Sequence, residues 1–383
     1  MNRRRFLVGA TACGACLVSQ QLGAQIPWQP PSRFTRPDLT TDEGGLWALM
    51  DREESRLRAS PFVLRDPALR NYVQSIACRV AGEHCPDIRV HLVSTPLFNA
   101  SMAPNGMMQV WTGLLLRMEN EAQLAAILGH EIGHYMQRHT LERLRDVRSR
   151  SAFSQFLGLF GVAGAVAQLA VLASMFSYSR EQEAEADQIG LVLMRKAGYD
   201  GREAGRIWEN LLLEVKARKD SDTMNIPMFA THPAPEDRQK ALQQLAAESD
   251  GGETGTDTWE KTIDTFRHEW IVDEVRRRQP DESLALLNRM VARVPVRAEY
   301  LYARGEVYRM RAGSGDIDAA ISDYRAAIDA GREPPETHRS LGLIYRTRSQ
   351  PAEAKASFER YLSAAPNAPD AAFIKAYLRE LGS

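Results

Sequence analysis

Two histidines and a glutamate form the pattern HExxH at residues 130–134. The apolar run at 122–128 that precedes the pattern indicates a helix. Residues four apart share one face of a helix, so His130 and His134 can present two imidazole nitrogens to one metal ion. Glu131 lies one step around the helix, within reach of a water molecule, as a general base must be. The pattern therefore predicts a zinc hydrolase, and the alternative is a helix that carries two surface histidines by chance.

The third ligand determines the class of zinc enzyme. A metzincin would have a histidine six residues beyond His134, but that residue is Thr140, and His139 is expected to lie off the ligand face, in solvent. A carboxylate from a second helix is the other option. Glu183 and Asp187 are four residues apart and share a face. One can bind zinc while the other accepts a hydrogen bond from a histidine ligand. The alternative is a solvated acidic surface.

The composition is that of an ordinary globular protein. The chain has 383 residues, of which 25% are charged and 44% hydrophobic, and its formal net charge is −1. This length accommodates two domains with separate cores. The balanced charge gives no basic patch of the kind that binds nucleic acid, so we expect no nucleic-acid partner.

Residues 1–24 have the features of a cleaved signal peptide. Arginines at 3–5 precede a short apolar stretch at 6–18, and small residues at 22–24 supply a cleavage site. The arginine pair also fits a twin-arginine signal, and an ordinary secretory signal is an equal alternative. A lipoprotein signal through Cys16 fits less well. In a bacterium each of these places the protein in the periplasm or cell envelope, where it can also be membrane-associated.

The two cysteines beyond the signal agree with export. Cys78 and Cys85 are close in sequence, and in an oxidising compartment we expect a local disulfide. The alternative is a pair of free thiols. A zinc site formed by these two residues alone is not expected, because no further cysteine or suitable histidine pair accompanies them.

The rest of the chain divides by pattern. We expect a Pro-rich linker at 25–41, a mostly helical domain with one short β region at 42–248, a second linker at 249–258 and a repeat domain at 259–383. Small and aromatic residues recur at the spacing of 34-residue tetratricopeptide units. In the clearest unit they are Leu341, Gly342, Tyr345, Ala354, Phe358 and Pro366. Such arrays usually hold a protein partner, and the alternative is that the array only stabilises the first domain.

Several motifs together resemble a known family. They are His130-Glu131-Ile132-Gly133-His134, Ser179-Arg180-x-x-Glu183-x-x-Ala186-Asp187-x-x-Gly190, Thr231-His232-Pro233-x-Pro235-x-x-Arg238 and Phe98-Asn99-Ala100-x-x-x-Pro104-x-Gly106. The chain resembles gluzincin metallopeptidases of the HtpX/CAAX-prenyl-protease type, and its layout is similar to that of their soluble periplasmic branch with C-terminal tetratricopeptide repeats.

This resemblance implies a fold and a set of roles. The expected fold is mainly α: an α+β zincin-like metallopeptidase domain with a small sheet, then a tetratricopeptide-like α-solenoid. Glu183 is implied as the third zinc ligand and Asp187 as the residue behind a histidine ligand. His232 is implied as a fourth ligand or gating residue, although by itself it is only a histidine in a loop. The resemblance also implies quality control of misfolded or misassembled envelope proteins, with repeats that recruit the outer-membrane assembly machinery.

The expected chemistry is hydrolysis of peptide bonds with one zinc ion per chain. Glu131 takes a proton from the attacking water and passes it to the leaving amine. We expect the strand at 107–112 to be an edge strand that pairs with an extended protein substrate. Tyr178, His232 and Arg238 are the candidates for stabilising the transition state. The other functional class is a periplasmic chaperone or scaffold that acts mainly through its repeats.

The 25 residues from 152 to 176 carry no charge. One membrane crossing there would put Glu183 about 30 Å from the two histidines, which a shared metal ion does not allow. We therefore expect a folded-back hairpin that covers the active-site cleft or touches the membrane surface, rather than a transmembrane protease. A buried core helix is the alternative.

Overall fold

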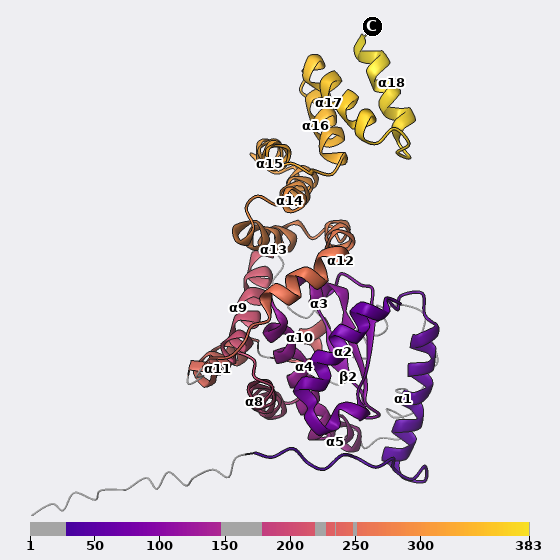
Figure 1. Ribbon diagram of the computed structural model, residues 1–383, viewed down its shortest axis with the longest axis vertical. Coiled ribbons are helices and arrows are strands. Elements are labelled where there is room, and N and C mark those ends of the chain that lie inside the picture. Colours follow the sequence, from indigo (N-terminus) through magenta and orange to yellow (C-terminus); the bar gives the residue numbers. More distant parts are fainter. Residues whose placement is uncertain (1–27, 147–177, 219–226, 234, 248–250, 383) are drawn as a thin grey trace, which may run out of the picture. The chain divides into compact units, whose positions relative to one another are not determined.

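The computed structural model describes residues 28–146, 178–218, 227–233, 235–247 and 251–382, and these are mainly helical, with a small sheet (Figure 1). The elements up to residue 247 are α1 (Asp42–Ala59), α2 (Pro67–Ala81), the 3-10 helix η1 (Gly82–Asp87), β1 (Arg89–Val93), β2 (Ala100–Met102), β3 (Met107–Trp111), α3 (Thr112–Arg117), α4 (Glu121–Met136), α5 (His139–Asp146), α8 (Arg180–Lys196), α9 (Arg202–Ala217), α10 (Pro227–Thr231) and α11 (Pro235–Ala247). The later elements are α12 (Thr256–Arg276), α13 (Pro280–Arg293), α14 (Ala298–Arg311), α15 (Asp316–Ala330), α16 (Glu336–Thr347), α17 (Pro351–Ala364) and α18 (Ala371–Gly382).

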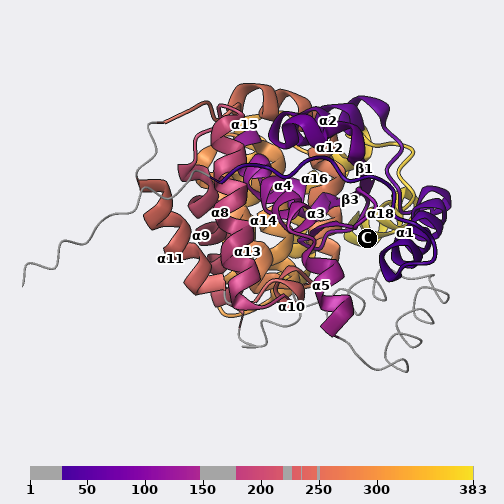
Figure 2. The same ribbon diagram turned by 90° about the horizontal axis from the view of Figure 1, so that it is seen from below.

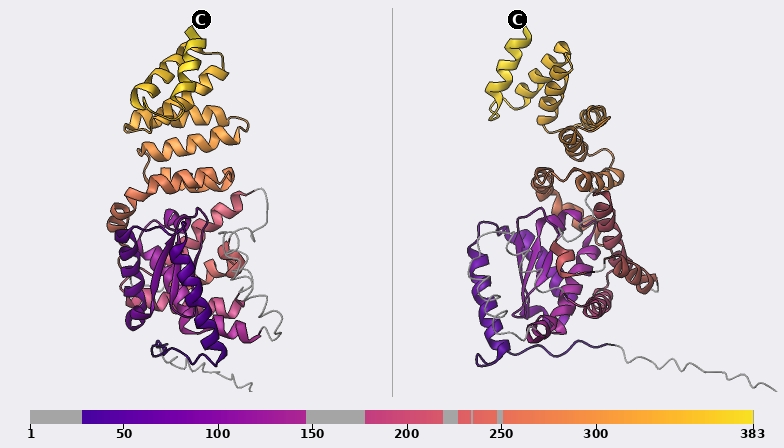
Figure 3. Two further views of the ribbon diagram at one scale, coloured as in Figure 1. Left: turned by 90° about the vertical axis from the view of Figure 1, so that its right-hand side faces the viewer. Right: turned by 180° about the vertical axis from the view of Figure 1, so that it is seen from behind.

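The sheet has the strand order β1-β3-β2 and lies between α1 and α8 (Figures 1 and 3). β1 runs parallel to β3 and β2 runs antiparallel to it. The prediction that the strand at 107–112 is an edge strand is therefore wrong, since β3 is the central strand. Side chains on both faces of β3 are buried, and only Gln109 is partly exposed, as in a strand that other elements cover on both faces. The edges of the sheet are β1 and β2.

Helix α4 is the centre of the first domain, and all its residues are buried. The Asn120 side chain accepts a hydrogen bond from the Gln123 N–H and so fixes where the helix begins. α4 packs closely against α8 because both helices have glycine at the crossing. A Cβ atom on Gly190 would lie 2.7 Å from the backbone nitrogen of His130. Helix α11 lies beside α9 in Figure 2, and it contacts both α9 and α8.

Helices α12 to α17 follow one another as successive pairs, with α18 after the last pair, and they fit an α-solenoid (Figure 3). Each of two pairs is held together by a glycine against an aromatic ring. A Cβ on Gly305 would lie 2.6 Å from Tyr324, and one on Gly342 would lie 2.5 Å from Phe358. These are the small and aromatic positions of the repeat pattern, so their spacing in the sequence follows from the packing within each helix pair.

The segment before α12 is hydrogen-bonded to earlier parts of the chain. Asp200 donates its N–H to the Glu253 carbonyl, and Ala122 donates to the Thr254 carbonyl, each at 3.0 Å. Trp259, at the start of α12, is fully buried and donates from its indole nitrogen to the Met118 carbonyl at 3.1 Å. The residues expected as a second linker are thus fixed at their C-terminal end.

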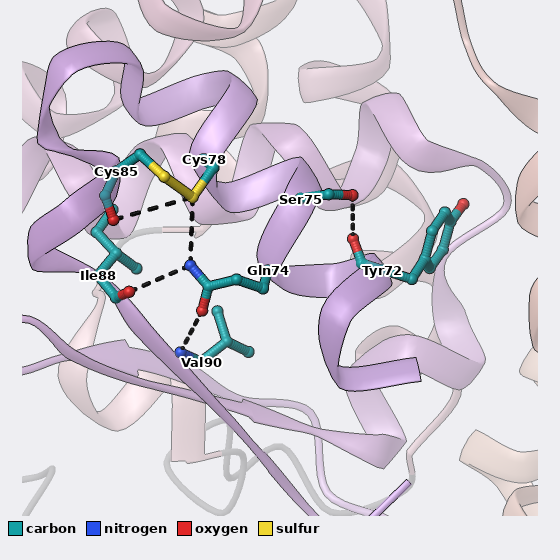
Figure 4. Close-up of a disulfide and its surroundings, with 7 residues drawn as sticks. All are labelled: Tyr72, Gln74, Ser75, Cys78, Cys85, Ile88 and Val90. Atoms are coloured by element: carbon teal, nitrogen blue, oxygen red, sulfur yellow. Dashed lines mark hydrogen bonds between the residues drawn. A yellow bond between two sulfur atoms is a disulfide. The ribbon is translucent and has the colours of Figure 1, made fainter. Parts of the chain in front are cut away.

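A disulfide joins Cys78, at the end of α2, to Cys85 in η1 (Figure 4). Gln74 on the same helix holds the following strand, because its side-chain amide donates to the Ile88 carbonyl at 3.1 Å and accepts from the Val90 N–H at 2.9 Å. The disulfide and this amide together attach α2 to the start of β1.

The expected signal peptide at 1–24 and the uncharged stretch at 152–176 lie outside the described residues. Among the helices that are described, none combines the length and the apolar character that crossing a membrane requires.

Candidate metal centre

Three side chains from two helices converge in the interior. His130 and His134 lie on successive turns of α4, and their Nε2 atoms are 3.1 Å apart. Glu183 comes from the first part of α8, with Oε2 3.5 Å from His130 Nε2 and Oε1 3.4 Å from His134 Nε2. The start of α8 is fixed by a capping box between Ser179 and Gln182. This cap places Glu183 on the helix face that meets α4.

A fourth donor comes from the residue after α10. His232 Nδ1 lies 3.1 Å from His130 Nε2 and 2.9 Å from Glu183 Oε1. The ligand atoms of all four residues lie within 4.8 Å of one another, and all four side chains are buried. Ligands placed 2.0–2.1 Å from a zinc ion in a tetrahedron would be about 3.3 Å apart. The donor set and its spacing therefore fit a four-coordinate metal ion, and zinc in particular.

Glu131 lies beside this cluster, with Oε1 3.4 Å from His232 Nε2. That oxygen is buried and has no hydrogen-bond partner within the described protein. A buried polar oxygen normally has a partner, so this one indicates a ligand or water site next to the four donors. Burial raises the pKa of the Glu131 carboxyl, although the charges of His232 and His130 oppose this shift.

Asp187 and Arg238 lie behind His130. Asp187 Oδ1 is 2.9 Å from His130 Nδ1, on the side of the ring away from the cluster. Arg238 donates to both Asp187 oxygens, at 2.8 and 2.6 Å, and its Nη1 lies 2.8 Å from Glu183 Oε2. Its guanidinium also covers the ring of Trp208 at 4.1 Å. Arg238 thus contacts one prospective ligand, Glu183, directly and supports another, His130, through Asp187.

The charged side chains around the donor atoms favour the ionised forms of Glu183 and Asp187. Burial opposes ionisation of Glu183, but the charges of His232 and Arg238 outweigh burial and hold the pKa of Glu183 well below its ordinary value. Burial is likewise outweighed at Asp187, where Arg238 lowers the pKa to about 2. For His232, the carboxylates of Glu183 and Glu131 outweigh burial and raise the pKa. Glu183 is therefore ionised, as a carboxylate that binds a metal ion must be.

His139 is not in solvent, so that prediction is wrong. Its side chain is 2% exposed, and its Nδ1 lies 2.8 Å from His134 Nδ1. The prediction assumed that the helix continues past His134, but α4 ends at Met136 and α5 begins at His139. Between them the chain makes a turn, in which Arg138 has a left-handed φ of +57°. No glycine or proline in the sequence marks this break.

Tyr178 stacks on the ring of His134, with centroids 3.8 Å apart and planes 17° apart. Its hydroxyl lies 3.0 Å from the Thr140 hydroxyl. Burial raises the pKa of this phenol, so it stays protonated. The ring of His134 is therefore held on its face by Tyr178 and on its edge by His139. The sequence suggested Tyr178 only as a stabiliser of the transition state and gave no signal for the stacking.

Both parts of the chain are similar to known proteins. Residues 63–246 match the family model "Peptidase family M48", and residues 269–333 and 311–369 match "Tetratricopeptide repeat". The chain is 25% identical to the beta-barrel assembly-enhancing protease of Escherichia coli K12 over 90% of this chain and 80% of that protein. It is 34% identical to the mitochondrial metalloendopeptidase OMA1 of Arabidopsis thaliana over 40% of this chain and 31% of that protein. The Saccharomyces cerevisiae OMA1 is 32% identical over 38% of this chain and 43% of its own length.

The fold, the buried donor set and these matches define a metalloprotease. The chain carries a peptidase family M48 domain followed by tetratricopeptide repeats, and it is homologous to the beta-barrel assembly-enhancing protease.

Proposed function

We propose that this protein is a zinc-dependent endopeptidase of the cell envelope that cleaves misfolded or misassembled proteins. The convergence of His130, His134 and Glu183 on one buried point carries this proposal, together with the buried Glu131 oxygen beside them that has no hydrogen-bond partner among the described residues. Two imidazoles and one carboxylate are a donor set typical of catalytic zinc. A zinc ion held there would polarise the scissile carbonyl and activate water for attack.

The remaining steps belong to the side chains. Glu131 accepts the proton of the attacking water and gives it to the leaving amine, and its buried position and raised pKa suit both transfers. Asp187 accepts a hydrogen bond from the Nδ1–H of His130 and so sets the tautomer of that ligand. Arg238 is already paired with Asp187 and Glu183. A positioning role therefore suits it better than direct contact with the developing oxyanion, for which Tyr178 and His232 remain candidates.

His232 is proposed to act as a gate. With His232 Nδ1 as fourth ligand, the tetrahedron would have no position for water or substrate. His232 would then have to move away before catalysis. The histidine follows the short helix α10, whose last residue, Thr231, accepts a hydrogen bond at 3.0 Å from the N–H of Tyr178, just before α8.

The substrate is proposed to bind as an extended strand on β2, which is a free edge of the sheet and packs against α4. Hydrogen bonds to the substrate backbone would supply much of the binding free energy, so substrates of many sequences could bind. A small hollow next to this edge, with room for about one water molecule, is lined by Met102, Pro104 and His134.

The location and partners are proposed from several observations. The signal-like residues at 1–24 and the disulfide between Cys78 and Cys85 suit an exported protein. The tetratricopeptide repeats suit protein recognition, and the name of the E. coli relative refers to β-barrel assembly. We therefore propose that the repeats bring substrates or an outer-membrane assembly complex to the peptidase. A membrane contact through 152–176 remains part of this proposal.

The second candidate is a chaperone or scaffold that acts mainly through its repeats. The repeat region supports it, because α-solenoids commonly bind proteins without chemistry. Glu131 favours the peptidase, since a scaffold needs no general base beside a metal site.

Substitution of Glu131 by Gln separates the two functions. In the full chain we expect casein cleavage to fall by about 10²–10⁴-fold while zinc content stays at one per chain. Glu183→Ala should instead lose the zinc. Cleavage by Glu131→Gln at the wild-type rate would overturn the peptidase mechanism, and equal zinc content in Glu183→Ala would overturn the ligand set.

A further inference from the structure

We propose that His139, supported by Glu185, is a positioning residue that sets the tautomer and orientation of His134. This inference rests on the proposed zinc site and extends it to the side of the cluster opposite Asp187. Nothing in the sequence pattern distinguished His139, and the family resemblance assigned it no role.

The observation is a short chain of ring nitrogens and a carboxylate. His134 Nδ1 lies 2.8 Å from His139 Nδ1, and His139 Nε2 lies 3.3 Å from Glu185 Oε2. His139 is buried, whereas the side chain of Glu185 is 47% exposed. The chain of contacts therefore runs from the metal centre to the surface of α8. Gln137 also donates to Glu185 and holds it in place.

The positions of the protons on His134 and His139 follow from the position of the metal site. His134 Nε2 faces the other donor atoms and must be free of a proton to bind a cation. The neutral ring therefore carries its proton on Nδ1 and donates it to His139 Nδ1. His139 must then carry its own proton on Nε2, where Glu185 can accept it. Every donor meets an acceptor in this arrangement.

The two histidine ligands are thus supported differently. His130 Nδ1 meets the carboxylate of Asp187 directly, at 2.9 Å. His134 Nδ1 meets a neutral imidazole, and the carboxylate of Glu185 is one residue further away. Partners of this kind orient the ring of a metal ligand, and their removal typically costs 10–100-fold in metal affinity. A purely structural role for His139, in which the ring only fills space at the start of α5, predicts no such loss.

Zinc titration of the full chain against a competing chelator tests the inference. His139→Leu fills the site without an acceptor, and we expect it to weaken zinc binding by about 10–100-fold. His139→Asn keeps an acceptor oxygen near the position of Nδ1 and should recover most of the affinity. The visible spectrum of the cobalt-substituted chain should change for the Leu variant and stay close to wild type for the Asn variant. Thermal unfolding of the metal-free chains reports any general loss of packing.

Two results would overturn the inference: wild-type affinity in a folded His139→Leu chain, or equal losses in the Leu and Asn variants. If His139→Leu does not fold, nitrogen-15 spectra of the histidines in the zinc-loaded wild-type chain give the answer. They should place a proton on His134 Nδ1 and on His139 Nε2, and the opposite tautomer of His139 rules the inference out. Glu183→Gln in the same titration is the reference. Unchanged zinc binding there would refute the zinc site itself, whereas loss there without loss in His139→Leu would refute only the role of His139.

Discussion

Arg117 and Glu274, which are 157 positions apart in the sequence, form a buried ion pair in which Arg117 Nη2 donates to Glu274 Oε2 at 3.0 Å. The other side of the guanidinium donates to Glu214 at 2.7 Å. Arg117 ends α3 in the peptidase region, and Glu274 lies in α12 at the start of the repeat region. The first repeat helices are therefore attached to the peptidase by fully buried charges and not only by a covalent linker.

Removal of one charge from this pair should be costly. We expect Glu274→Ala to lower the free energy of unfolding by about 3–5 kcal/mol, because it leaves a buried guanidinium incompletely paired. Urea denaturation measures the change. Arg276→Ala on the same helix is a suitable control, since Arg276 is 75% exposed and its pair with Asp273 should be worth less than about 1 kcal/mol. Equal effects of the two substitutions would contradict the role given to the buried pair.

The same pair predicts a dependence on pH. Burial opposes ionisation of Glu274, but Arg117 and Arg277 outweigh it and lower the pKa of the carboxyl below its ordinary 4.5. The folded chain therefore binds this proton less readily than the unfolded chain. The stabilisation is fully present above pH 4.5 and is lost as the pH falls through the lower, folded-state pKa. Unfolding free energies measured from pH 6 to pH 3 should fall more steeply for wild type than for Glu274→Gln, and parallel curves would count against this account.

The close crossing of α4 and α8 predicts a strict need for glycine at position 190. In Gly190→Ala the new Cβ would meet the backbone of His130, and backbone cannot move aside as a side chain can. We expect a loss of about 1–3 kcal/mol in stability together with weaker zinc binding. Gly45→Ala is the matched control, because Gly45 lies in α1 with no atom near its missing Cβ. That variant should be more stable by about 0.5–1 kcal/mol. Tolerance of alanine at 190 with normal zinc binding would show that the crossing is not so close.

Metal removal should destabilise the peptidase region. The buried cluster contains Glu183 and three histidines. Without a metal ion, the charge of the Glu183 carboxylate is balanced only by Arg238 and His232 among the described residues. A ligand at 100 times its Kd stabilises a folded chain by about 2.7 kcal/mol. We therefore expect a chelator to lower the Tm of wild type and added zinc to restore it. Glu183→Gln should show a much smaller response, and an equal response would place the metal elsewhere.

The proposed gate predicts that substitution of His232 raises activity, whereas substitution of Glu131 lowers it. If His232 is a fourth ligand in the resting enzyme, His232→Ala opens a coordination position. We expect the variant to cleave casein faster than wild type while binding zinc somewhat more weakly. Loss of cleavage with unchanged zinc affinity would instead assign His232 to the transition state. The two outcomes differ in both rate and metal affinity, so one titration and one assay distinguish them.

The sequence by itself determined the local parts of this protein. HExxH spacing on a helix, the second-helix pair Glu183 and Asp187, and the repeat positions Gly342 and Phe358 depend on helix periodicity, which a short stretch of residues records. The mainly helical class with a small sheet followed by a solenoid was predictable for the same reason. The ordered family motifs added His232, which has no local signal.

Only the tertiary structure decided the features that depend on how distant segments meet. The strand at 107–111 is central because β1 and β2 pair on either side of it, and neither partner can be inferred from the strand itself. His139 contacts His134 because the chain turns at Arg138, and arginine is not a residue that usually marks such a turn. Arg117 meets Glu274 because α12 packs against α3. Periodicity specifies which face of an element is buried, whereas pairing, chain reversal and docking depend on the free energy of the whole packed chain.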